Sequence, residues 1–316
     1  MRLHNTFEAK LFGSDPSSKG GDLNAYAESS DLPLQAARLR RLELRTKHLV
    51  ESSFAGQYQS VFKGRGMNFE EVRPYAPGDE IRSIDWNVTA RTGEPYIKKF
   101  NEEREVTVMI LLDVSASGNF GSVKESKREL AAEVAALLAF SAIYNNDKVG
   151  LLLFSDTIEL FVPPKKGRLH QLRLIRDMFY FQPKSRGTNI KQAIEYLNKV
   201  MTRRAIVFVI SDFCDNDFSQ PLAVTARRHD MVALPIIDPV EEMLPDVGLI
   251  TLEDPETGEL LEVNTSSSSL RERYHELAEH RERDLLHLFA SRRIDMVLLR
   301  TDQDYLPILR SFFEKR

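Results

Sequence analysis

Long apolar segments alternate with amphipathic segments over the last two thirds of the chain. The apolar segments span residues 106–112, 149–154, 158–162, 205–210, 231–237 and 294–299. Between them, apolar residues recur at helical spacing, as at Leu130, Val134, Leu137 and Leu138. Strands that are apolar almost throughout are typical of a parallel sheet covered by helices on both faces. We therefore predict an α/β domain with a mostly parallel sheet over residues 104–316.

Two breaks in this alternation predict antiparallel hairpins. Residues 158–162 follow residues 149–154 across a short turn, which favours a hairpin at a sheet edge. A second hairpin is expected where residues 249–252 and 260–263 flank the turn from Asp254 to Gly258. The serine run at 266–269 is expected to cap the helix that follows it.

The first hundred residues have a different pattern. Residues 1–30 are polar and rich in Ser, Gly and Asp, which predicts a flexible leader. Residues 31–103 are read as a basic amphipathic helix, within 32–50, followed by a small β-rich module without a helical stripe. The helix is interpreted as an ordinary surface helix, and a contact with an acidic partner is the alternative.

An acid–arginine set within this module has two readings. We favour an internal ion-pair network, and the alternative is a surface for docking a partner. Trp86 is expected in core or interdomain packing, because a lone Trp buries much area. The set consists of Asp79, Arg82, Asp85, Trp86 and Arg91.

Composition and charge exclude some classes of protein. Hydrophobic residues make up 42% and charged residues 28%, which is typical of a soluble globular protein. A formal net charge of -4 argues against general nucleic-acid binding. No apolar run is long enough to span a bilayer, and the N-terminus lacks the apolar core of a secretory signal. With a single Cys, these features predict a cytoplasmic protein that approaches a membrane only through partners.

Five oxygen-bearing side chains stand where strands and helices meet. Asp113, Ser115 and Ser117 follow the first apolar strand, Thr188 precedes a helix, and Asp212 ends the strand at 205–210. In an open α/β sheet, such strand ends meet at the switch point, where ligands bind. Oxygen ligands suit Mg²⁺ or Mn²⁺, and the absence of nearby His or Cys argues against zinc. Two charged ligands leave a position for a carboxylate of another molecule, which predicts a metal-dependent adhesion site.

Each of these residues also has a purely structural interpretation. Thr188 would cap its helix, Ser115 and Ser117 would bond to loop backbone, and Asp212 would accept from buried amides. Their combination favours metal binding. Cys214 is interpreted as a small packed residue, with a reactive thiol as the alternative.

Catalytic alternatives use the same residues. A phosphatase of the haloacid-dehalogenase type would need a second acid two residues after Asp113, where the chain has Ser115. A metal-dependent hydrolase would need a general base near the cation, and no His or Glu is evident there. The hydrolase stays open as an alternative, as does a structural assembly protein with a vestigial metal site.

The order Asp113-x-Ser115-x-Ser117, then Thr188, then Asp212 resembles the metal motif of von Willebrand factor A-like domains. The upstream segment from Gly64 to Arg91, with Arg-Pro-Tyr followed by Pro-Gly-Asp-Glu-Ile-Arg-Ser-Ile-Asp-Trp, resembles the signature of the bacterial domain of unknown function 58 family. The resemblance runs from about Leu34 to the C-terminus.

The resemblance implies a Rossmann-type, von Willebrand factor A-like fold preceded by the β-rich module and an N-terminal helix. It also implies that the five residues hold the metal ion. Genes of this family commonly lie beside those of MoxR-type AAA+ ATPases. The resemblance therefore implies a metal-dependent adaptor or co-chaperone that binds such an ATPase and its client protein.

Overall fold

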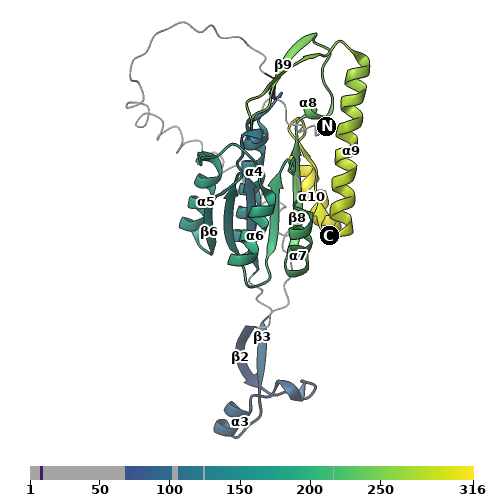
Figure 1. Ribbon diagram of the computed structural model, residues 1–316. Coiled ribbons are helices and arrows are strands. Elements are labelled where there is room, and N and C mark those ends of the chain that lie inside the picture. The colour runs from purple at the N-terminus through teal and green to yellow at the C-terminus, as the bar shows by residue number, and fades with distance from the viewer. Residues whose placement is uncertain (1–7, 10–67, 102–105, 124, 216) are drawn as a thin grey trace, which may run out of the picture. The chain divides into compact units, whose positions relative to one another are not determined.

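The computed structural model describes residues 8–9, 68–101, 106–123, 125–215 and 217–316 (Figure 1). These residues belong to two compact units, one over residues 62–106 and one that contains residues 107–316. The predicted basic helix at 32–50 and all of the predicted leader except Glu8 and Ala9 lie outside the described residues.

The smaller unit is an antiparallel hairpin with a short helix. Strands β2 (Asn68–Pro74) and β3 (Tyr96–Asn101) pair around the 3-10 turn η2 (Ile81–Ser83) and helix α3 (Trp86–Thr92). The β-rich module thus also contains a short helix, which has no buried apolar stripe and is capped by Asp85. Its carboxylate accepts the N–H groups of Asn87 and Val88 at 3.0 and 3.3 Å.

The acid–arginine set of this unit is only partly the network that we expected. Asp79 pairs with Arg73, which the sequence reading left out, through two bonds of 2.7 and 2.9 Å. This pairing lowers the pKa of Asp79. Trp86 is 68% exposed, so the predicted role in core packing is wrong, and interdomain packing stays a prediction.

The larger unit is built on one doubly wound sheet. From β4 the chain adds β5 and β6 on one side, then returns to add β7, β8 and β11 on the other. All neighbours are parallel except β6, which runs antiparallel to β5 at the edge. This order confirms the predicted mostly parallel, Rossmann-type sheet, and it confirms the edge hairpin. The strands are β4 (Thr107–Asp113), β5 (Lys148–Phe154), β6 (Ile158–Lys165), β7 (Ile206–Ser211), β8 (Asp230–Ile237) and β11 (Asp295–Met296), with β12 (Leu299–Arg300) also paired to β8.

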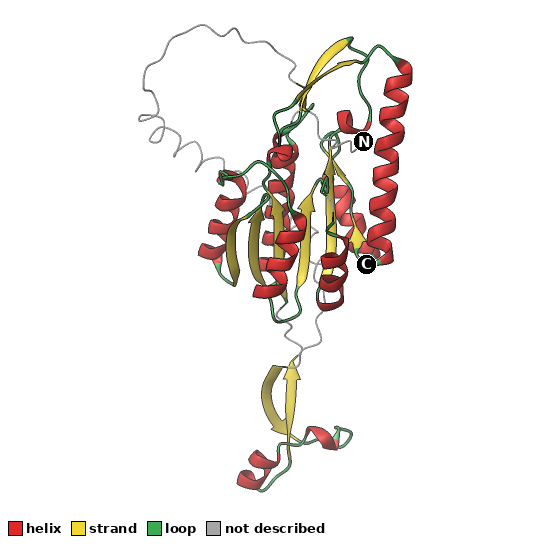
Figure 2. Ribbon diagram, viewed as in Figure 1, coloured by secondary structure: helices red, strands yellow, loops and turns green. Residues whose placement is uncertain are grey.

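Helices cover both faces of this sheet, as Figure 2 shows. Met109 and Leu111 of β4 pack into one core with α6, α7 and α9, and α4 and α5 pack on the opposite face. The five residues at the centre of β4 are buried, which explains why this strand is apolar throughout. The helices are α4 (Lys127–Tyr144), α5 (Arg168–Tyr180), α6 (Ile190–Val200), α7 (Ser219–Arg228), α8 (Pro239–Glu242), α9 (Ser268–Ser291) and α10 (Tyr305–Lys315).

The second predicted hairpin is also present. Strands β9 (Leu249–Glu253) and β10 (Leu260–Asn264) pair antiparallel, and β1 (Glu8–Ala9) adds to the free side of β9. Ser267 caps α9, as the serine run predicted. Within the described part of the chain, no helix has the length and apolar character that crossing a bilayer requires.

Candidate metal centre

The two predicted acidic ligands stand at the ends of neighbouring parallel strands. Asp113 is the last residue of β4, Asp212 directly follows β7, and Leu112 lies opposite Ile210 in the ladder. The chain winds in opposite directions from β4 and β7, so these strand ends flank the switch point of the sheet. The two carboxylates are close enough for the charge of Asp212 to act on Asp113.

The two serines after β4 are part of the same hydrogen-bonded cluster. The backbone N–H of Ser115 donates to Asp113 Oδ1 at 2.9 Å, and the hydroxyl oxygens of Ser115 and Ser117 lie 3.0 Å apart. The Ser117 side chain is hydrogen-bonded to Asp212. Both serines are buried. Through these contacts the structure brings together four of the five predicted residues, namely Asp113, Ser115, Ser117 and Asp212.

Thr188 approaches this cluster from a separate loop. Ala116 N–H donates to the Arg186 carbonyl at 2.9 Å, which holds the loop beside the serines. Asn189, and not Thr188, caps α6 by accepting from Gln192 N–H. The Thr188 hydroxyl instead donates to Glu256 Oε1 at 2.7 Å. The structural alternative for Thr188 as a helix cap is therefore wrong, and its described side-chain partner is an acid from the β9–β10 turn.

Lys127 is a member of the site that the sequence reading missed. Its ammonium lies 2.9 Å from Asp212 Oδ2 and 2.6 Å from Glu241 Oε1, and all three side chains are at most 7% exposed. Lys127 is the first residue of α4, where the helix dipole disfavours a cation, so the two acids must compensate. Asp212 and Glu241 are 85 and 114 residues away, and no local pattern signals such a contact.

This arrangement makes the two aspartates electrostatically unequal. Burial and the charge of Asp212 raise the pKa of Asp113 to about 7, although hydrogen bonds from Ser211 and Ser115 oppose the shift. Burial would also raise the pKa of Asp212, but Lys127 outweighs it and lowers this pKa to about 2. Asp212 is therefore firmly ionised, whereas Asp113 lacks a positive charge that would stabilise its ionised form.

The residues present fit a small hard cation. A cavity of about 20 Å³, with room for roughly one water-sized particle, is lined by both aspartates, Ser117, Lys127 and Ser211 among others. Except for Lys127, these side chains offer oxygen, which Mg²⁺ prefers. Among the described residues, no group of three or more His, Cys, Asp or Glu side chains is placed to hold a metal. A cation here would therefore depend on the serine hydroxyls as well as the acids.

Cys214 follows Asp212 by two residues and contacts its side chain. Its N–H donates to Asp212 Oδ1 at 3.1 Å, and its sulfur accepts from Arg281 Nη1 at 3.2 Å. Burial and the charge of Asp212 raise the pKa of the thiol, which keeps it protonated and poorly nucleophilic. The structure thus favours the packed residue over the reactive thiol.

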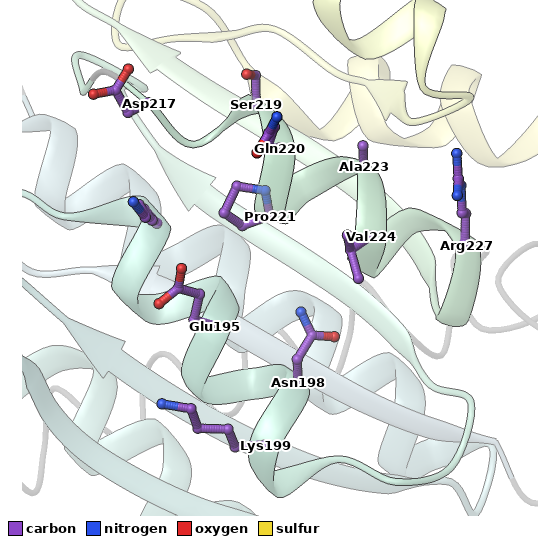
Figure 3. Close-up of a pocket in the computed structure, with 11 residues that line it drawn as sticks. Glu195, Asn198, Lys199, Asp217, Ser219, Gln220, Pro221, Ala223, Val224 and Arg227 are labelled. Carbon is purple, nitrogen blue, oxygen red and sulfur yellow. The ribbon is translucent and has the colours of Figure 1, made fainter.

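The larger hollow on the surface is a different feature. A groove of about 980 Å³ runs between α6 and α7, and its lining side chains come from these helices and the loop before α7 (Figure 3). Lys191, Lys199 and Arg227 mix there with Glu195 and Asp217. None of the five predicted ligands lines this groove, so the candidate site remains the strand-end cluster.

Comparisons with known proteins give a family and leave its activity open. A family model described as "Protein of unknown function DUF58" matches residues 71–284. An uncharacterized protein of Mycobacterium tuberculosis is 32% identical over 95% of this chain and 93% of its own length. The uncharacterized protein YeaD of Bacillus subtilis is 26% identical over 44% of this chain and 33% of its own length.

Solved structures also match. BatB of Bacteroides thetaiotaomicron is 17% identical, covers 67% of this chain and all of its own, and gives a TM-score of 0.42. The SpRpn10 VWA domain is 14% identical, covers 65% of this chain and 94% of its own, and gives a TM-score of 0.36.

Proposed function

This chain belongs to the DUF58 family of proteins of unknown function, and from that premise we propose that it is an adaptor that binds an acidic partner through Mg²⁺. The ion would be held by Asp113, Ser115, Ser117, Thr188 and Asp212, with Mn²⁺ as the alternative ion. The observation that carries the proposal is the pair of unequal aspartates beside a cavity lined by oxygen donors. A divalent cation would stabilise the ionised form of Asp113.

Binding explains this site better than chemistry does. Two acids and three hydroxyls leave a small dication short of negative charge, so a carboxylate from another protein would complete its surroundings. Lys127 already neutralises part of the charge of Asp212. The protein alone should therefore bind the ion weakly, and the acid of a partner should strengthen the binding.

The partner that we propose is a MoxR-type AAA+ ATPase with its client protein, in the cytoplasm. The support for this choice is the resemblance of the upstream segment, where Asp79 and Asp85 lie, to the family whose genes commonly lie beside such ATPases. Asp79 and Asp85 organise the smaller unit through Arg73 and helix α3. The adhesion site itself lies in the larger unit.

Affinity capture of the ATPase by the full chain tests this function. Capture should be lost on chelation with EDTA and in Asp113→Ala, because both remove the ion. Glu195→Gln is the matched control, since it removes a surface acid away from the strand-end cluster. Capture that survives both EDTA and Asp113→Ala would overturn the proposal for this partner.

A metal-dependent hydrolase remains the second candidate because of Glu256. The sequence reading found no general base near the cation, but the structure places the Glu256 carboxylate on Thr188. Burial raises its pKa, which is the direction that makes a carboxylate a stronger base. Purified protein with Mg²⁺ would be screened against phosphoesters and peptides. Turnover that is lost in both Asp113→Asn and Glu256→Gln would favour this function over the adaptor.

A further inference from the structure

Glu256 reaches the candidate site from a distant part of the chain. It lies in the turn between β9 and β10, 68 residues after Thr188, and accepts the hydroxyl of Thr188 at 2.7 Å. Figure 1 shows the hairpin that carries this turn close to one end of the main sheet. One hairpin therefore brings an acid to the side of the metal cluster that Thr188 borders.

The turn is built to hold Glu256 in place. Asp254 Oδ1 accepts the N–H of Glu256 at 2.9 Å, and the Asp254 carbonyl accepts the N–H of Gly258 at 2.7 Å. Gly258 has a φ of 77°, which favours glycine and closes the turn. Pro255 is buried and Glu256 is half-buried, whereas the nearby Glu259 is exposed. The backbone thus directs one of the two glutamates of this turn inward.

The charge of the surroundings makes this placement unfavourable without a cation. Glu256 lies near Asp212, Asp254 and Asp215, three acids whose negative charges repel its carboxylate. The Thr188 hydroxyl provides one hydrogen bond but no positive charge. A dication in the cluster would turn this repulsion into attraction, because a carboxylate is the ligand that the five predicted residues leave missing.

We propose that Glu256 is the site's own carboxylate ligand, held by the β9–β10 turn where the acid of a partner would bind. The hairpin then competes with the partner, and a partner's acid must displace Glu256 before it reaches the ion. This inference rests on the proposed function, since it requires an ion at the site. It replaces the expectation that the missing acid belongs only to another protein.

The simpler interpretation is that Glu256 only anchors the hairpin to Thr188. Two substitutions separate the two roles. Glu256→Gln retains an oxygen that accepts from Thr188 and loses the charge, whereas Glu256→Ala loses both. Glu259→Ala is the matched control, because it removes an exposed acid from the same turn.

The first measurement is calorimetric titration of Mg²⁺ into the full chain and each variant. If Glu256 is a ligand, Glu256→Gln and Glu256→Ala both bind Mg²⁺ several-fold more weakly than the wild type, and Glu259→Ala binds as the wild type does. If Glu256 is only an anchor, Glu256→Gln behaves as the wild type, and the inference is overturned.

The second measurement is fluorescence anisotropy of a short labelled oligoglutamate peptide in the presence of Mg²⁺. If the open form makes up about one tenth of the wild-type molecules, Glu256→Ala should bind the peptide about tenfold more tightly. Glu259→Ala should bind it no more tightly than the wild type does. An affinity for the peptide that is equal in Glu256→Ala and the wild type overturns the competition.

The titration of Mg²⁺ into the wild type shows whether a negative result contradicts only the role of Glu256 or the proposed metal site as a whole. If the wild type binds Mg²⁺ and the Glu256 variants match it, only the inference about Glu256 fails. If neither the wild type nor any variant binds Mg²⁺, the proposed function fails, and the inference fails with it.

Discussion

Lys127 and Asp212 form a buried ion pair, with 2.9 Å between Nζ and Oδ2, at the point where β7 ends and α4 begins. The pair keeps Asp212 ionised and oriented. Asp113 has no such partner in the described structure and shares its surroundings with the charge of Asp212. Lys127 therefore neutralises only part of the negative charge of the two aspartates. The remaining charge favours a bound cation, and the part that is already neutralised makes this binding weak.

Lys127→Met should strongly destabilise the protein. The substitution leaves Asp212 and Glu241 buried without their shared cation, and breaking one side of a buried pair costs about 3–5 kcal/mol. Urea unfolding of the variant and the wild type measures this difference. Lys191→Met, which removes an exposed lysine from α6, is the control and should change stability little. Equal losses in the two variants would contradict the structural role of Lys127.

Asp113→Asn should retain the fold and lose the ion. With a pKa of about 7, the Asp113 charge is unfavourable beside Asp212 at pH 8 when no cation is present. The metal-free variant should therefore be at least as stable as the wild type in thermal unfolding at pH 8. Added MgCl₂ should raise the melting temperature of the wild type alone, and an equal rise in both proteins would count against Asp113 as a ligand.

Cys214 should react slowly with iodoacetamide in the native protein. Burial and the charge of Asp212 raise its pKa, so little thiolate is present at neutral pH. Mass spectrometry of timed samples would follow the modification in native and urea-unfolded protein. Rates that match in the two states would show that the thiol is accessible and would restore the reactive reading.

The contribution of His229 to stability should be lost as the pH drops below about 6.5. Burial and the charges of Arg228 and Arg204 lower the pKa of His229, and its Nδ1 accepts the N–H of Ala205 at 3.2 Å. The pKa of His229 in the unfolded chain is 6.5, and its pKa in the folded protein is lower. Below pH 6.5 the imidazole is therefore protonated in the unfolded chain before it is protonated in the folded protein, which favours unfolding.

Urea unfolding at pH 7.5 and 5.5 tests this sign. His229→Gln should lose less stability between the two pH values than the wild type, because the amide does not titrate. A larger loss in the variant than in the wild type would contradict the neutral, buried state of His229.

Periodicity predicted most of the larger unit because its strands are buried on both faces. The sequence around Leu111 and Val209 is apolar for that reason, and both strands were found with their ends within one or two residues. Helix α3 was missed because its seven residues bury none of their side chains and so give no apolar stripe. Its cap, Asp85, was visible in the sequence, but it was read as part of an ion-pair network.

The candidate site was predictable only where its residues follow strands. Asp113 and Asp212 could be placed together because parallel strands share a carboxyl edge. Lys127, Glu241 and Glu256 reach the site from the start of α4, from α8 and from the β9–β10 turn, and their contacts span 68 to 114 residues. Such contacts depend on how the layers pack, which no local pattern records.

Calorimetric titration of Mg²⁺ into the full chain and Asp113→Asn at pH 8 tests the central claim most directly. The account predicts saturable binding of one ion per chain by the wild type and by the control Glu195→Gln, and its loss in Asp113→Asn. Absence of saturable binding by the wild type, or equal binding by Asp113→Asn, would contradict a metal centre at the ends of β4 and β7.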